Sequence, residues 1–368
     1  MMKFSLENRE FSVNRQTIHM DQGITYAPEY IESRRIIDYP SRRAQIVRAV
    51  WKGQLQADEQ IAKGTFRPML TGQGERWQNF YEDDACDEYA DVIVLGREML
   101  LKQGFMPQVT EKIQAAMKAN QGHILNVPAF EASWSKEDLI DAASSRVLLV
   151  DDATAVYAAD KADGFLTVLA EKGEKFASLE CTYLGYEHFA HGMVDQAKVI
   201  LEKALENLKG KEVLVTSGQS LYMLTKVAEK LELQPAKAML IWQAFAPYED
   251  LAEVYVYGGS FNLRFLQLPL AEWFPADEEA EKKDTPEFFK LLVGQDRINV
   301  LNRWQPPIAA EFEVFGLEKE EKDAIFASGC AQVKKAEAKE LVALDPTAYK
   351  KAKEEGLAQD VKWIGELV

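Results

Sequence analysis

The spacing of apolar residues divides the chain into two parts. Up to residue 140, apolar residues recur at helical spacing in segments 44–54, 89–103 and 107–120. No stretch of this part has the alternating or continuous apolar pattern that is typical of a strand. The pattern predicts an all-helical front region over residues 1–140.

Beyond residue 146, short apolar runs alternate with helical segments. The runs are 147–150, 176–179 and 212–216, and the helical segments between them are 161–172 and 193–208. A short, continuous apolar run is typical of a strand buried on both faces, and such strands alternate with helices in parallel sheets. Residues 146–248 are therefore expected to form a doubly wound α/β unit.

A second series of the same kind occupies residues 252–368. Its strand-like runs are 254–257, 298–301, 311–315 and 341–344, with an acidic linker at 276–284 and helical segments at 320–339 and after Tyr349. The expected fold class is thus α/β, with the helical region in front of two doubly wound units.

Composition limits the classes of function. The net charge of −16 disfavours binding to nucleic-acid phosphates, because that binding depends on clustered Lys and Arg. The three cysteines form no CxxC pair, so no disulfide framework is expected. Residues 1–10 are polar, and no apolar stretch reaches the roughly 18 residues that a spanning helix needs. We expect a cytoplasmic protein without a membrane span of its own.

The segments after the first three strand runs carry a recognisable pattern. Residues 150–155, 183–185 and 216–221 read Val-Asp-Asp-Ala-Thr-Ala, Tyr-Leu-Gly and Thr-Ser-Gly-Gln-Ser-Leu. They resemble the cysteine-rich CCG repeat of the heterodisulfide reductase family, which includes related iron–sulfur proteins of glycolate, lactate and glycerol-3-phosphate oxidation. In that family the strands end in Gly-Cys, Cys-Cys-Gly and Cys-Pro-x-Cys, and the thiolates converge at one sheet edge. Here the thiolate positions hold Ala153, Tyr183, Leu184, Gly218 and Leu221.

The second unit extends the resemblance. Residues 314–316 and 345–348 look like Cys-Cys-Gly and Cys-Pro-x-Cys, and 259–264 resembles Pro-Cys-His-Leu-Gly-Arg. Residues 361–367 are similar to the C-terminal helix of the family. The thiolate positions of this unit hold Val314, Phe315, Asp345 and Ala348.

The front region resembles the helical ferredoxin domain of the same family. Residues 39–46 look like the linker between its two four-cysteine motifs, and 17–30 looks like the first motif, with Ala27 in a ligand position. The second motif would fall within 71–84, which contains no cysteine. The resemblance thus implies a ferredoxin-like domain over 1–140 and CCG-like units over 146–248 and 252–368.

The missing cysteines have a direct chemical consequence. Iron–sulfur clusters are held by sets of thiolates, which the residues in these positions do not provide. We therefore expect no iron–sulfur cluster and no other cofactor in this chain.

A different metal site is an alternative for the same sheet edge. Cys181, His188 and His191 lie within eleven residues of one another after the second strand, and Asp152 follows the first strand. Carboxyl ends of parallel strands share one edge, and Cys, His and Asp are zinc ligands. The competing interpretation is a buried thiol with ordinary packing and surface histidines.

Two functional hypotheses follow. The first is a non-catalytic structural, docking or regulatory subunit of a redox complex of the heterodisulfide-reductase type. The resemblance implies cluster-bearing iron–sulfur and flavin subunits as partners, and membrane association only through them. Candidate contacts, or else core residues, are Trp51, Trp77, Phe80 and Tyr81.

The second hypothesis is a small-molecule-binding protein or enzyme that uses the vacated cluster pocket. Polar residues expected to gather there are Asp152, Tyr183, Ser217, Ser220 and Asp345. Against it, Tyr183, Leu184, Leu221 and Phe315 are larger than the residues they replace, which favours a filled pocket.

Overall fold

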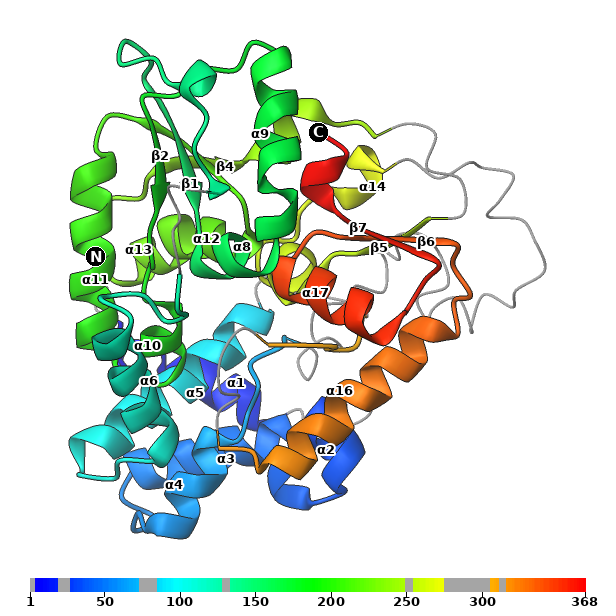
Figure 1. Cartoon of the computed structure of the whole chain (residues 1–368). Coiled ribbons are helices and arrows are strands. Elements are labelled where there is room, and N and C mark those ends of the chain that lie inside the picture. The colour runs from blue at the N-terminus through cyan, green and yellow to red at the C-terminus, as the bar shows by residue number, and fades with distance from the viewer. Residues whose placement is uncertain are drawn as a thin grey trace.

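The chain folds into a helical region and two parallel sheets, as the expected α/β class requires (Figure 1). The structure is a computed structural model and describes residues 4–18, 27–72, 85–127, 133–248, 254–274, 305–310 and 316–368. Among these residues, no helix has the length and apolar character needed to cross a bilayer.

The regular structure of the front region is helical, apart from one β-bridge between Ile140 and Phe176. Its helices are α1 Glu10–Ile18, α2 Pro28–Ser33, α3 Pro40–Trp51, α4 Glu59–Phe66, α5 Ala85–Lys102 and α6 Gln108–Ala119. The helices expected at 44–54, 89–103 and 107–120 are confirmed. Gly96 lets α5 approach α3 closely, because a β-carbon there would lie 2.5 Å from Cγ2 of Val47.

The first sheet has four parallel strands in the order β2-β1-β3-β4. They are β1 Arg146–Val150, β2 Ser178–Cys181, β3 Glu212–Val215 and β4 Lys237–Leu240. The helices between them are α8 Asp152–Tyr157, α9 Ala162–Glu171, α10 Tyr186–Ala190, α11 Val194–Leu208, α12 Gly218–Tyr222 and α13 Ala228–Lys230. The three expected strands are confirmed, although β2 begins two residues later than the apolar run at 176–179; β4 was not predicted.

The second sheet has three parallel strands in the order β5-β6-β7. They are β5 Val254–Tyr257, β6 Glu340–Ala343 and β7 Asp360–Trp363, and the helices here are α14 Leu270–Trp273, α16 Lys319–Lys334 and α17 Pro346–Glu355. The strands at 254–257 and 341–344 are thus confirmed to within a residue. The expected runs at 298–301 and 311–315 and the acidic linker at 276–284 lie outside the described residues.

The helix expected over 361–367 is wrong. Residues up to Trp363 form strand β7, and only Ile364–Glu366 form a 3₁₀ turn. The reason is pairing with β6, since Val361 lies opposite Leu341 and Trp363 opposite Ala343. The ladder satisfies backbone groups that a helix would otherwise pair within itself.

One hydrophobic core joins the helical region to both sheets. At its centre the Trp363 ring lies 5.2 Å from the Phe165 ring and 6.2 Å from the rings of both Trp134 and Trp242, all in edge-on geometry. Such edge-to-face contacts add to the free energy gained by burying the rings. The regions expected at 1–140, 146–248 and 252–368 therefore share a core.

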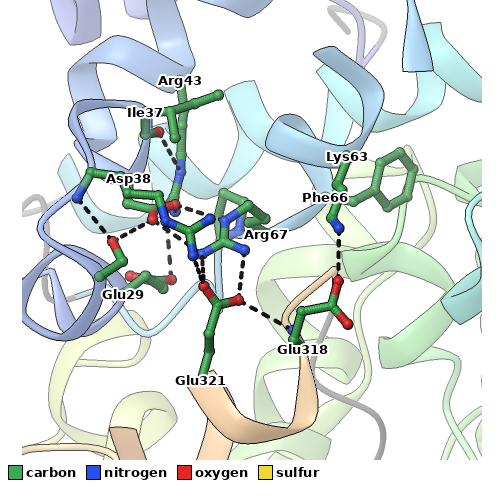
Figure 2. A network of polar contacts seen from close by, with 12 residues as sticks. Glu29, Ile37, Asp38, Arg43, Lys63, Phe66, Arg67, Glu318 and Glu321 are labelled. Carbon is green, nitrogen blue, oxygen red and sulfur yellow. Dashed lines mark hydrogen bonds and ion pairs between the residues drawn. The ribbon is translucent and has the colours of Figure 1, made fainter. Parts of the chain in front are cut away.

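A buried ion-pair network connects the helical region to α16 (Figure 2). Asp38, which has no exposed surface, accepts hydrogen bonds from Arg43 at 2.5 Å and from Arg67 at 2.9 and 3.1 Å. Arg67 also donates to Glu321 of α16 at 2.8 Å. Burial alone would raise the pKa of Asp38, but both arginines outweigh it and hold that pKa below its ordinary value. The network fixes α16 against the front region.

Candidate functional site

The carboxyl ends of the two sheets meet. Gly218 begins α12 directly after β3, and the π-helical segment Phe261–Phe265 follows β5. A β-carbon added to Gly218 would overlap Oδ1 of Asn262 and would lie 3.1 Å from Cβ of Phe261. Residues after β3 and residues after β5 are therefore in van der Waals contact at this position.

The end of the first sheet is closed by a hydrogen-bonded cluster. Asp151 follows β1, accepts a hydrogen bond from the Thr154 amide at 2.8 Å and caps α8. Its carboxylate also accepts hydrogen bonds from the hydroxyls of Ser217 and, at 3.4 Å, Ser220. Burial raises the pKa of Asp151. Ser217 and Ser220, which were expected at the vacated pocket, thus hold one another and Asp151 in place.

Asp152 anchors the loop that precedes the first sheet. Its carboxylate lies 2.7 Å from Nδ1 of His123 and accepts hydrogen bonds from the backbone amides of Ile124 at 2.6 Å and Leu125 at 3.1 Å. The hydrogen bond to Asp152 raises the pKa of His123. Three interactions with residues 123–125 make this carboxylate a structural anchor.

The structure brings two of the four expected metal ligands together. Cys181 and Asp152 lie with His123 in a group whose ligand atoms are all within 4.8 Å of one another. Cys, His and Asp form a donor set that suits zinc. Two features oppose a metal here: the Asp152 oxygens already accept hydrogen bonds, and burial, followed by the neighbouring aspartates, raises the pKa of the Cys181 thiol.

His188 and His191 are outside that group. Nδ1 of His188 lies 2.9 Å from the Tyr183 hydroxyl, and Nδ1 of His191 donates to the Glu187 carbonyl oxygen at 2.7 Å. Burial lowers the pKa of His188 to about 4 and that of His191 to about 3. Both rings are therefore neutral at physiological pH.

A cavity of about 110 Å³ lies between the strand ends of the two sheets and the front region. Its polar walls come from α10, α12, the segment after β5 and the start of α17, and include Glu187, Gln219, Ser260, Asp345 and Thr347. Burial raises the pKa of Glu187 to about 7 and that of Asp345 to about 6. Two acidic groups therefore line a cavity whose environment disfavours their charge.

Asp345 also caps α17, and its Oδ1 accepts hydrogen bonds from the amides of Thr347 at 2.8 Å and Ala348 at 3.1 Å. Asp345 and Ala348 are the two residues from the expected thiolate positions that line this cavity. Tyr183, Leu184 and Ser220 line a smaller hollow of about 10 Å³ beside it.

The remaining expected positions lie elsewhere. Ala153 is buried in α8, Leu221 is buried in α12, and Ala27 is buried just before α2. Val314 and Phe315 are outside the described residues, as are Trp77, Phe80 and Tyr81.

Three residues of these sites were not found from the sequence, namely His123, Glu187 and Thr347. His123 lies far from the strand ends in the sequence, and Thr347 occupies the variable position of the 345–348 segment, which was not expected to have a role. A signal was available for Glu187, because it stands between the expected strand end and the noted histidines.

The chain matches no protein-family model, no curated protein and no solved structure.

Proposed function

We propose that the chain is a cluster-free, non-catalytic subunit of a multi-subunit redox complex of the heterodisulfide-reductase type. In this proposal it gives structure and a docking surface, while iron–sulfur and flavin subunits carry the electrons. The order of the parts supports it: a helical front region, which would be the ferredoxin-like domain, precedes two parallel sheets, which would be the CCG-type units.

The observation that carries the proposal is the close packing at Gly218. This residue occupies a position that resembles a cluster thiolate, yet a β-carbon there would overlap Asn262. A cysteine would need that β-carbon, and a cluster would need additional space between the sheets. The neighbouring polar residues, Asp151 and Ser217, are hydrogen-bonded to one another. The arrangement supports a scaffold that is held by side chains where the family uses thiolates.

The experiment compares the chain purified with its native partners and the same chain expressed alone. We expect the native complex to contain iron, acid-labile sulfide and flavin, and the isolated chain to show no iron above background and no broad absorption near ~400 nm. A matched control replaces Cys86, Cys181 and Cys330 by Ser, and its iron content should equal that of the wild type.

Two results would contradict the proposal. Stoichiometric iron in the isolated chain, lost in the cysteine-free control, would show a cluster. Purification of the chain from its native source without any redox subunit would contradict its role in a redox complex. The alternative from the sequence, ligand binding at the vacated pocket, has separate structural support at the cavity.

A further inference from the structure

Two buried side-chain oxygen atoms line the cavity between the two sheets and can accept a hydrogen bond from a ligand. Glu187 of α10 is 5% exposed and Thr347 of α17 is 7% exposed, and both line the cavity. Oε2 of Glu187 and Oγ1 of Thr347 make no hydrogen bond of normal geometry with the described residues. The side chains of Tyr183 and Gln219 act on the Glu187 carboxyl as weak donors, and the Thr347 hydroxyl acts on the Asp345 carboxyl in the same way. A buried polar atom without a partner costs free energy, so a ligand that donates hydrogen bonds here recovers that cost.

The charge of the site favours a positively charged donor. Asp345 lines the same cavity, and in the described part of the chain neither Glu187 nor Asp345 forms an ion pair. Burial is the largest cause of the elevated pKa values of the two carboxyl groups, and the neighbouring charges that act on them are the carboxylates of Asp152 and Asp151. The buried Arg264 donates to Ser260 in the cavity wall and, within the described residues, does not pair with either carboxyl group. A bound cation would favour the ionised carboxylates.

The geometry selects an organic cation over a metal ion. Among the described residues, the potential metal ligands whose atoms lie within 4.8 Å of one another are those of His123, Asp152 and Cys181. Glu187 and Asp345 are not part of this group. Another wall of the cavity is apolar, with Leu70, Phe261 and Pro307. A volume of about 110 Å³ is of the same order as the ~150 Å³ cavity that holds benzene in another protein. A ligand of a few carbon atoms fits.

We propose that this cavity binds a small organic ammonium ion, a primary amine on a short apolar stem, whose ammonium group donates hydrogen bonds to Glu187 and Thr347. The stem lies against Leu70, Phe261 and Pro307. Charged hydrogen bonds and burial of the stem act together, so neither a neutral alcohol nor an anion of the same size satisfies the site. This inference is independent of any partner subunit.

The test is calorimetric titration of the full chain at pH 8 with n-butylammonium, with n-butanol and n-butyrate as matched probes. At this pH both carboxyl groups are ionised in the cavity and the amine remains protonated. We expect n-butylammonium to bind with one site per chain, and the other two probes not to bind. Nα-acetyl-lysine amide, which keeps its ε-ammonium group, distinguishes two sources of the ligand in the same titration. If it binds, the site is assigned to a lysine side chain. If it fails to bind while n-butylammonium binds, the site is assigned to a free amine.

Three variants locate the site. Glu187→Gln keeps the shape and removes the charge, and should weaken binding by about 10-fold or more, the usual effect of losing a charged hydrogen bond. Thr347→Val should also weaken it. Glu202→Gln, on the exposed face of α11, is the matched control and should bind as the wild type does. Circular dichroism confirms that each variant is folded, and Thr347→Val retains the test if Glu187→Gln does not fold.

The proposal is overturned if n-butylammonium binds no better than n-butanol, which would leave the cavity to water. It is also overturned if binding is the same in Glu187→Gln and Thr347→Val as in the wild type.

Discussion

Removing the Asp38 charge should destabilise the chain strongly. Asp38 is fully buried between Arg43 and Arg67, whose side chains are 2% and 4% exposed. Substitution by Asn keeps the size of the side chain and one acceptor oxygen. It removes the negative charge that lies between the two buried guanidinium groups. Removing one partner of a buried ion pair costs about 3–5 kcal/mol.

The structure places Asp38→Asn near the low end of that range and Asp38→Ala near the high end. Arg67 keeps Glu321 at 2.8 Å, and Arg43 keeps Glu29 at 3.7 Å, so neither arginine loses all negative neighbours. Alanine also removes the acceptors that the Asn side chain partly retains. We therefore expect losses of about 3 kcal/mol for Asn and about 5 kcal/mol for Ala in the free energy of unfolding.

The assay is guanidinium unfolding at pH 7, followed by far-ultraviolet circular dichroism. The control is Glu318→Gln, which removes the exposed ion pair between Lys63 and Glu318 at the edge of the same network (Figure 2). Gln keeps a side-chain acceptor at this N-cap of α16, so the free energy of unfolding should fall much less than in Asp38→Asn. Because the pKa of Asp38 is lowered on folding, its contribution is present above the ordinary value of 3.8 and is lost as the pH falls through the folded-state pKa. The difference between wild type and Asp38→Asn should therefore shrink in acid. A loss below about 1 kcal/mol at pH 7 would refute the reasoning.

Three further measurements test other parts of the structure. Gly329→Ala should destabilise the chain by about 1–3 kcal/mol in the same unfolding assay, because the new β-carbon would overlap the Pro307 carbonyl oxygen. Its control is Gly164→Ala in helix α9, which should stabilise the chain by about 0.5 kcal/mol because no atom lies within 4 Å of the new β-carbon. Because folding raises the pKa of Glu187 to about 7, its favourable contribution is complete below 4.5 and is lost as the pH rises through about 7. The melting temperature of wild type should thus fall relative to Glu187→Gln over that interval, and parallel curves would contradict the elevated pKa. His123→Ala should lower the free energy of unfolding by about 1 kcal/mol, because the hydrogen bond between His123 and Asp152 is lost. Equilibrium dialysis of the wild type should find no bound Zn²⁺. Stoichiometric zinc that is present in the wild type and absent from the variant would show that His123 and Asp152 form a metal site.

Most strands that could be predicted from the sequence are buried ones. The exception is β2, a half-buried edge strand that was found because an apolar run begins just before it at Phe176. β1, apolar from Val147 to Val150 and buried over those residues, gave a continuous run. β4 and β7 lie at sheet edges, start with an exposed Lys237 or Asp360 and become buried only at their last residue. Charged residues at an edge interrupt the apolar run, so these two strands lacked the pattern on which the prediction depends.

The candidate site was predictable only in its location. The carboxyl ends of parallel strands indicated where polar residues would meet, and Asp345 was among those named. The presence of Glu187 and Thr347 in the wall of one cavity depends on how two separate sheets approach one another. That approach is set by side-chain packing across the shared core, for which spacing along the chain gives no signal.

The close approach at Gly218 also limits any attempt to build a metal site between the two sheets by mutation. Placing cysteines at the strand ends would supply sulfur atoms, but a side chain at position 218 would first collide with Asn262. Chemical reconstitution with iron and sulfide would therefore require the Asn262 side chain to move first. A successful redesign would have to begin with the residues after β5, by shortening Asn262 and moving Phe261 away, so that the two sheets stand further apart before any ligand is added.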